Sequence, residues 1–152
     1  MPLDGFHESR SLARARRRFV LTRNRAFADV MRGCGSTHGP TWITPGMLNA
    51  YVRLHDLGWA HSIEVWRGGE LVGGVYGVAV GGLFAAESMF HRARDASKVA
   101  LAALVDHLRD RAFGLLDVQL LTPHLASLGA IEVAREAYLA GLAAVLGNPV
   151  TW

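Results

Sequence analysis

Apolar residues recur along the middle of the chain with the spacing of β-strands. Residues 61–66 alternate between apolar and polar side chains, which predicts a strand with one buried face. Residues 71–80 are apolar on both sides, as is typical of a strand in the centre of a sheet. Glycine pairs at 68–69 and 81–82 predict tight turns, and residues 83–86 extend the pattern. The three segments together predict an antiparallel meander.

Helical patterns flank this meander. Thr44 before Pro45 is a strong helix start, because the hydroxyl can cap the first turn and proline fits the first helical position; Gly58 is expected to end this helix. A long amphipathic helix is expected from about Ala96 to Phe113. Weaker signals predict a short basic helix capped by Ser9 or Ser11, a strand over 19–22, a helix capped by Asn24 that ends at Gly33, a loop over 33–40, and helical pieces at 124–129 and 134–146.

These elements indicate the fold class. Strands alternate with helices, so we expect an α/β (α+β) protein with a mixed central sheet flanked by helices. A helix, an antiparallel meander, a helix and a further strand is the order of an N-acyltransferase of the GNAT type.

The predicted strand over residues 115–121 contains two polar side chains among leucines and a valine, Asp117 and Gln119. Because alternate residues of a strand point the same way, both would lie on one face of it. Each would cost about 1–3 kcal/mol if buried without a partner. Residues 85–88 add a second carboxylate, Glu87, where strand is expected to become loop. Two interpretations stay open: structural hydrogen bonds, or a site that positions an amine.

Length and composition place the chain among ordered globular proteins. Its 152 residues suit one domain, expected to span 1–152, with 51% hydrophobic and 19% charged residues. No apolar run approaches the roughly 20 residues that cross a bilayer, and the polar N-terminus does not look like a secretory signal. The single cysteine, Cys34, fits a reducing cytosol, so we expect a cytoplasmic protein. The seven histidines show no metal-ligand spacing, so we expect no metal site.

Basic residues gather in an Arg-rich N-terminal segment, at about residues 8–32. Fifteen of the sixteen basic residues are Arg, and eight of these lie within the first 32 positions of a chain whose net charge is +3. A guanidinium group can bond two phosphate oxygens at once, which favours RNA binding, although a solvated helix face explains the pattern equally well. The candidate RNA-binding residues are Arg14, Arg16, Arg17 and Arg18.

Several short motifs stand along the chain in an order that is specific to one known family. They are Leu3-Asp4-Gly5-Phe6-His7, Thr41-Trp42-Ile43-Thr44, His61-Ser62-Ile63-Glu64-Val65-Trp66, Glu70-Leu71-Val72-Gly73-Gly74-Val75-Tyr76-Gly77, Glu87-Ser88-Met89-Phe90, Asp95-Ala96-Ser97-Lys98, the Asp117-x-Gln119 pair and Ala126-Ser127-Leu128-Gly129-Ala130. In these stretches the chain resembles the leucyl/phenylalanyl-tRNA–protein transferases. The likeness covers nearly the whole chain and corresponds to their GNAT-like catalytic C-terminal domain, with their N-terminal domain absent.

The resemblance implies a reaction and its partners. Such enzymes move Leu or Phe, with Met as a further candidate, from its tRNA ester to the N-terminal Arg or Lys of a protein, which marks that protein for degradation by the N-degron pathway. The expected partners are therefore the 3′ end of aminoacyl-tRNA and proteins or peptides with N-terminal Arg or Lys, with no membrane. Aminolysis of an ester runs downhill, so no metal or organic cofactor is implied. We expect a monomer.

Functional residues carry over from the family by position. Asp117 and Gln119 match the pair that orients the acceptor amine and draws its proton, with Asp117 polarising the Gln119 amide. Glu87 matches the acidic residue of the acceptor site. Nine residues match the pocket for the donor's side chain: Trp42, Val75, Phe84, Ser88, Met89, Leu101, Leu104, Leu108 and Leu116. For each of them, ordinary core packing is an alternative interpretation.

This sequence departs from the family's pattern in the pocket wall. Val75 stands where relatives often have Met, and Leu104 and Leu108 stand where they can have Phe. The preference between Leu and Phe therefore does not carry over from the resemblance.

Two other functions stay open. A truncated relative could bind tRNA or peptide without transferring, although intact Glu87, Asp117 and Gln119 argue against loss of the site. A CoA-dependent N-acetyltransferase would cradle pyrophosphate in a Gly-rich turn before the helix, and residues 87–98 contain no Gly, which makes this the weaker alternative.

Overall fold

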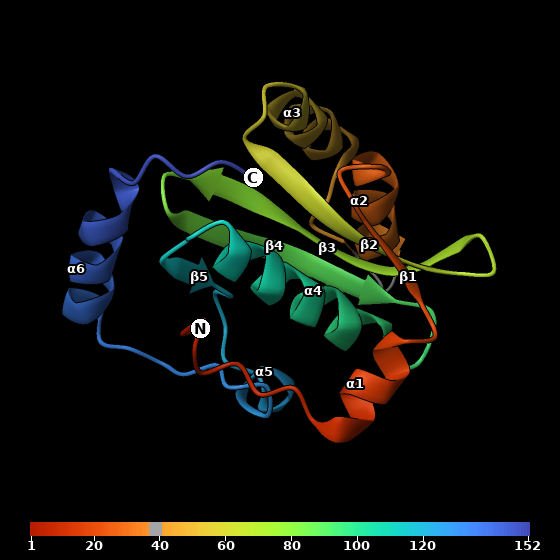
Figure 1. Cartoon of the computed structure of the whole chain (residues 1–152). Coiled ribbons are helices and arrows are strands. Elements are labelled where there is room, and N and C mark those ends of the chain that lie inside the picture. The colour runs from red at the N-terminus through yellow and green to blue at the C-terminus, as the bar shows by residue number, and fades with distance from the viewer. Residues whose placement is uncertain (37–40) are drawn as a thin grey trace.

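The computed structural model describes residues 1–36 and 41–152, which place a mixed five-stranded sheet between helices (Figure 1). The strands are β1 (Val20–Arg23), β2 (Ala60–Arg67), β3 (Glu70–Val80), β4 (Leu83–His91) and β5 (Leu115–Asp117). The helices are α1 (Arg10–Arg16), α2 (Phe27–Ser36), α3 (Pro45–Asp56), α4 (Ala96–Asp110), α5 (Pro123–Ala126) and α6 (Arg135–Leu146).

The strands lie in chain order across the sheet. β1 to β4 run antiparallel to their neighbours, which confirms the predicted meander, and β5 lies parallel to β4. A parallel pair needs a crossover connection, and α4 provides it while packing on β2, β3 and β4. β3 is the central strand, as its apolar residues on both faces predicted.

Alternating side chains of β3 separate two hydrophobic cores. Val75 belongs to the larger core, where it meets α4, and Tyr76 belongs to a smaller core with residues of α2. Because neighbouring residues of a strand point to opposite faces, α4 and α2 cover the two sides of the sheet. α3 packs outside α2 and along β2.

The predicted caps are confirmed for two helices. The Ser9 hydroxyl accepts a hydrogen bond from the Leu12 N–H at 3.2 Å at the start of α1. The Thr44 hydroxyl accepts one from the Met47 N–H at 3.3 Å at the start of α3. Gly58 follows α3 with a φ of 81°, the left-handed conformation that glycine adopts without strain.

The predicted bounds of the next helix are wrong at both ends. Asn24 does not cap it, because α2 begins only at Phe27 and Asn24 itself has a φ of 57°. The Asn24 side chain instead bonds to β2. Gly33 does not end α2, which continues to Ser36; a Cβ on Gly33 would lie 2.6 Å from the Phe90 ring, so this glycine serves packing. The remainder of the predicted loop, residues 37–40, lies outside the described residues.

Two later elements also differ from their predicted bounds. α4 ends at Asp110, not Phe113, because Ala112 turns the chain toward β5 with a φ of 59°. The helical pieces predicted near the C-terminus appear as α5 and α6.

β4 is longer than predicted and contains an irregularity that decides the position of the candidate site. The strand continues to His91, so Glu87 and its neighbours are strand residues and not the start of a loop. Tyr76 of β3 pairs with Ser88 while Gly77 pairs with Ala86, which leaves Glu87 as the extra residue of a β-bulge. A Cβ on Gly77 would lie 2.2 Å from the Ala85 carbonyl oxygen, so only glycine allows this close approach. Bulges commonly re-aim a side chain beside an active site.

Candidate active site at the opening between β4 and β5

The two parallel strands stay paired over only three residues. Leu83 to Ala85 pair with Leu115 to Asp117, and β5 then ends while β4 continues for six more residues to His91. The chain after Asp117 leaves the sheet, with Gln119 at a φ of 62°. An opening forms where the strands part. It contains a cavity of about 110 Å³ lined by Val75, Ala86, Glu87, Ser88, Met89, Leu101, Val118 and Leu125.

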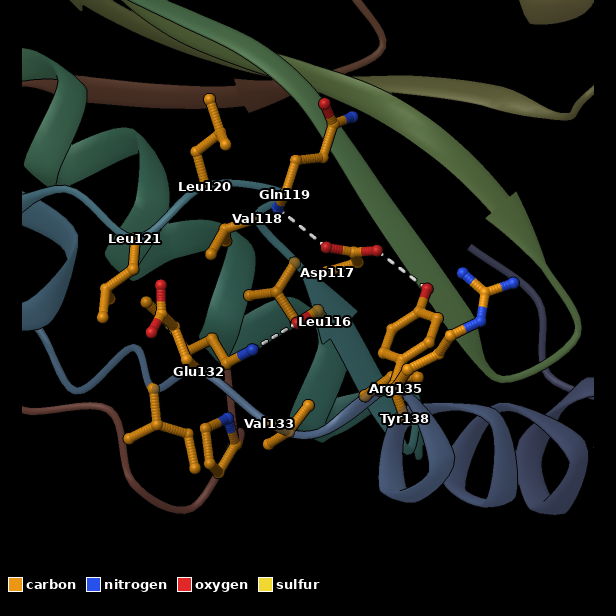
Figure 2. A pocket seen from close by; sticks show the side chains of 14 residues that line it. Leu116, Asp117, Val118, Gln119, Leu120, Leu121, Glu132, Val133, Arg135 and Tyr138 are labelled. Carbon is orange, nitrogen blue, oxygen red and sulfur yellow. Dashed lines mark hydrogen bonds between the residues drawn. The ribbon is translucent and has the colours of Figure 1, made fainter.

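The three polar residues that were expected to act together do lie together, although not for the predicted reason. They are Glu87, Asp117 and Gln119. Because β5 ends at Asp117, the prediction that Asp117 and Gln119 share one face of a buried strand is wrong, and Leu120 beyond them is 75% exposed. The Gln119 backbone N–H donates to Asp117 Oδ1 at 2.7 Å, and this local bond sets the turn (Figure 2). Gln119 Nε2 donates to Glu87 Oε2 at 3.2 Å. A reversal of the chain therefore joins the three residues.

The carboxylate of Asp117 is held on both sides. Its Oδ1 accepts from the Gln119 backbone, and its Oδ2 accepts from the Tyr138 hydroxyl of α6 at 2.8 Å (Figure 2). The expectation that Asp117 polarises the side-chain amide of Gln119 is therefore not met, since that amide bonds to Glu87. Asp117 orients the Gln119 backbone, and Gln119 Oε1 accepts no hydrogen bond from the described residues.

Two tyrosines that the sequence did not suggest belong to the site. Tyr138 holds Asp117, and this hydrogen bond is the main cause that raises the pKa of Tyr138. Tyr51 lies in α3. Burial raises the pKa of Tyr51, and the charge and hydrogen bond of Glu87 raise it further. The Glu87 carboxylate therefore accepts from Gln119, and its negative charge acts on Tyr51.

The residues expected to form the donor pocket divide into three groups. Val75, Ser88, Met89 and Leu101 line the cavity. Trp42 lies apart from them, half exposed in the segment before α3, where its neighbour Ile43 packs against the smaller core on the α2 side of the sheet. The fully buried residues belong to the core around the cavity: Phe84, Leu104, Leu108 and Leu116.

Three further residues line the cavity that sequence reasoning missed. Ala86 precedes the bulge, Val118 follows β5 and Leu125 lies in α5. An engineered apolar cavity of roughly 150 Å³ holds benzene, so a cavity of this order accepts a side chain such as that of Leu.

A second, larger cleft runs along the outer side of β5. Its volume is about 760 Å³, and Figure 2 shows Tyr138 and Arg135 together at one side of it, with Glu132 and Val133 toward the other. The α-amino group of Met1 donates to the Leu116 carbonyl oxygen here at 2.6 Å. The site thus opens both to the small cavity and to this cleft.

The four candidate RNA-binding arginines are not equivalent. Arg16 donates to Asp106 Oδ2 of α4 at 2.6 Å and lies 3.8 Å from Glu8, so it ties α1 to α4. Arg14, Arg17 and Arg18 are exposed. The prediction that these three contact RNA stays a prediction, and Arg16 has a structural role that competes with it.

Residues 1–36 and 41–152 contain neither a helix suited to crossing a membrane nor a cluster of metal-binding side chains. No helix there is both long and apolar enough to cross a membrane. No group of three or more His, Cys, Asp and Glu side chains there is placed to hold a metal ion.

Solved structures show the class to which this fold belongs. A ribosomal-protein-alanine N-acetyltransferase from Brucella melitensis biovar Abortus 2308 superimposes with a TM-score of 0.52 at 18% identity, over 76% of this chain and 92% of that one. An aminoglycoside acetyltransferase from an uncultured soil metagenomic sample gives 0.55 at 15% identity, over 76% and 93%. At these identities the likeness concerns the fold alone, and the fold is that of the GNAT-type acyltransferases.

Sequence comparison is more specific within that class. The family model described as leucyl/phenylalanyl-tRNA protein transferase matches residues 1–143. Proteins with that name from Ruegeria pomeroyi and Cereibacter sphaeroides are 55% and 58% identical over 90% of this chain, and one from Chlorobaculum tepidum is 45% identical over all of it. The chain belongs to the leucyl/phenylalanyl-tRNA–protein transferase family. It spans 66%, 64% and 81% of the lengths of these three relatives.

Proposed function

We propose that this chain transfers Leu, Phe or Met from aminoacyl-tRNA to the N-terminal Arg or Lys of a protein, which commits that protein to N-degron proteolysis. The single observation that carries the proposal is the position of the Glu87–Gln119–Asp117 cluster at the rim of a small apolar cavity. An apolar donor side chain fits the cavity, and a cationic acceptor fits the carboxylate beside it. Family membership supports the same reaction.

In this reaction the acceptor's neutral α-amine attacks the ester carbonyl carbon of the donor. A C–N bond forms, the bond from that carbon to the ribose oxygen breaks, and the proton lost by the amine ends on the ribose oxygen. The chain's main contribution is to hold amine and carbonyl together, which can lower the barrier by roughly 7–11 kcal/mol.

Each polar residue has a distinct task in this proposal. Gln119 Oε1 accepts a hydrogen bond from the attacking amine, because Nε2 is already engaged with Glu87. Asp117 fixes the Gln119 backbone and offers negative charge as the amine becomes positive. Glu87 pairs with the acceptor's guanidinium or ammonium group. None of these tasks calls for a metal or an organic cofactor.

We place the reaction in the cytoplasm and expect the chain to act as a monomer. Aminoacyl-tRNA is the donor, and Glu87, Asp117, Gln119, Tyr51 and Tyr138 all come from one chain.

The experiment incubates the purified chain with labelled leucyl-tRNA and peptides that begin with Arg, Lys, Asp or Ala. Label should enter the Arg and Lys peptides only, and Glu87→Gln should remove most of the difference between peptides. Binding of leucyl-tRNA without any transfer would favour the non-catalytic relative. Equal transfer to all four peptides would exclude Glu87 as the group that selects the acceptor.

A further inference from the structure

A second cavity, lined mainly by basic and polar side chains, lies next to the apolar cavity. The proposed reaction gives its basic side chains no role. Its volume is about 550 Å³. It lies where β4 ends and α4 begins, with one wall from α5. The residues that line it are Met89, His91, Arg94, Asp95, Ser97, Lys98 and His124.

Basic side chains outnumber acidic ones in the lining of this cavity. Lys98 is the only lysine of the chain, and it forms no ion pair among the described residues. Asp95 is the one carboxylate in the lining, and it lies 3.8 Å from Arg94 Nε. Burial lowers the pKa of His124, and the charges of Lys98 and His91 lower it further. A lowered pKa favours the neutral form of His124, whose ring can still donate one hydrogen bond, and Lys98 supplies positive charge.

The same cavity carries neutral donors suited to an anion. The Ser97 hydroxyl lies 3.4 Å from His91 Nδ1, and either group can donate to an oxygen. Lys98 supplies a charged ammonium group from the same helical turn as Ser97. A phosphate ester, with a fixed negative charge and several acceptor oxygens, matches this set.

The basic cavity shares a wall with the apolar one. Met89 lines both, and the neighbours Leu125 and His124 line one each. A donor whose side chain enters the apolar cavity therefore has its ester near the basic groups. In aminoacyl-tRNA that ester and a phosphate are attached to the same terminal ribose, so one ligand can reach both places.

We propose that Lys98, Ser97, His91, Arg94 and His124 form a subsite for the phosphate on the 5′ side of the terminal ribose of the donor RNA. This subsite rests on the proposed function, because it assumes an aminoacyl ester in the neighbouring cavity. It fixes the distance from the phosphate to the ester, and so it aligns the carbonyl carbon with the acceptor amine. A phosphate contact reads no base, so the subsite is independent of RNA sequence.

The test compares stable amide analogues of the donor end that differ by one group. Adenosine with a 3′-leucylamino group is measured with and without a 5′-phosphate, and the 3′-glycylamino compounds serve as the second pair. Affinities are measured by calorimetry at one fixed ionic strength, because phosphate contacts weaken with salt. The phosphate should strengthen binding about tenfold, as hydrogen bonds to a charged group typically do.

Variants then locate the effect. Lys98→Gln and His124→Gln, on α4 and α5, should each remove most of the tenfold gain, and Lys98→Arg should restore it. Arg53→Gln removes the same charge from the exposed face of α3 and should leave the gain intact. Melting temperatures of all four proteins show whether each is folded.

The outcomes separate this subsite from the reaction itself. The difference between leucyl and glycyl compounds reports on the apolar cavity and hence on the proposed function; the difference made by the phosphate reports on the subsite. An equal phosphate gain in folded Lys98→Gln and His124→Gln, or no gain in the unaltered chain, would overturn the proposal. Coenzyme A is a further probe: if it binds as tightly as the phosphorylated leucyl compound and depends on Lys98, the subsite belongs to a different phosphate ester.

Discussion

Two groups of polar side chains, both from motifs that mark the sequence, differ in what surrounds them. The first joins β1 to β2. Glu64 is 0% exposed, and its carboxylate accepts hydrogen bonds from Ser62 Oγ and Thr22 Oγ1, both at 2.5 Å. Trp66 Nε1 in turn donates to Thr22 Oγ1 at 2.7 Å. Each polar atom of this group is used to hold the scaffold together.

The second group lies at the opening between β4 and β5 and is only partly enclosed. Glu87 and Asp117 are half-buried, and Gln119 is exposed. Their hydrogen bonds orient the side chains while Gln119 Oε1 and part of the Glu87 carboxylate remain available to a ligand. Residue type and motif therefore do not separate scaffold from site. Solvent access and unused hydrogen-bonding capacity do.

Replacing Asp117 should give the largest effect. Asp117→Asn keeps the shape and can still accept from the Gln119 backbone, so the melting temperature should change little. The loss of negative charge beside the amine should lower the transfer rate by about 10²–10³. Gln119→Ala should do the same with donor binding largely retained, since the apolar cavity is a separate set of contacts. Rates and melting temperatures are measured on the same preparations.

The matched control is Asp29→Asn, which changes an exposed carboxylate of α2 and should affect neither quantity. A large fall in melting temperature with near-normal turnover per folded molecule would show that Asp117 has a structural role, like Glu64. The proposed difference between the two polar groups would then be wrong.

Acidification should lower the stability of the fold through His61, which lies in β2 beside the buried polar group. Asn24 Oδ1 accepts from the Ser62 N–H, so its Nδ2 faces His61 Nδ1 at 2.9 Å and requires a neutral, accepting imidazole. Burial lowers the pKa of His61 to about 4. The unfolded chain, with an ordinary histidine pKa of about 6.5, then binds the proton more readily, so the free energy of unfolding should fall by up to about 3 kcal/mol as pH drops from about 6.5 to about 4.

Urea unfolding at several pH values checks this dependence. His61→Phe keeps a ring to stack on Trp152, which lies 4.5 Å away between ring centroids, but cannot titrate. Its stability should therefore vary less between pH 6.5 and pH 4. The burial of His107 lowers its pKa too and leaves a residual slope in both proteins. Identical slopes would show that His61 contributes nothing.

Glu64→Gln tests the buried polar group between β1 and β2 by a change that should affect stability and not activity. Glutamine fits the space but adds an amide N–H₂ that must face a hydroxyl of Ser62 or Thr22, in a site with no exposure. The free energy of unfolding should fall by about 1–3 kcal/mol. The transfer rate per folded molecule, measured below the melting temperature, should stay unchanged. A specific loss of rate would mean that the β1–β2 group communicates with the site.

The smallest effect is expected from Tyr138→Phe, which removes the hydroxyl that donates to Asp117 Oδ2. Asp117 would keep its hydrogen bond from the Gln119 backbone but lose the one from α6. We therefore expect kcat to fall by up to about tenfold with the donor KM unchanged. Tyr51→Phe is the matched change beside Glu87, and it should alter the preference among acceptor peptides instead. Equal effects of both changes on kcat would remove the distinction between the two tyrosines.

Much of the scaffold could be predicted because its signals are local. The strand over 61–66, the Thr44 cap and the helix after Asp95 depend on neighbours within a few residues, and the structure contains them. The prediction that this strand has only one buried face is wrong, because helices pack on both sides of β2 and bury Ser62 and Glu64 as well. The length of β4 could not be predicted, since polar residues at Glu87 and Ser88 look like the end of a strand. They stay in the sheet because β3 pairs with them and a bulge absorbs the extra residue.

By itself, the sequence determined the strand and helix periodicities and the fold class, and it led to the expectation that Asp117, Gln119 and Glu87 belong to one site. Only the tertiary structure decided how these three residues meet: β5 stops at Asp117, the chain reverses through Gln119, and Tyr138 arrives from a helix 21 positions away. It also set Trp42 apart from the cavity and brought Lys98 and His124 to one basic cavity. The physical reason is that periodicity records which face of an element is buried, whereas the place where two paired strands part depends on contacts between residues far apart in the chain.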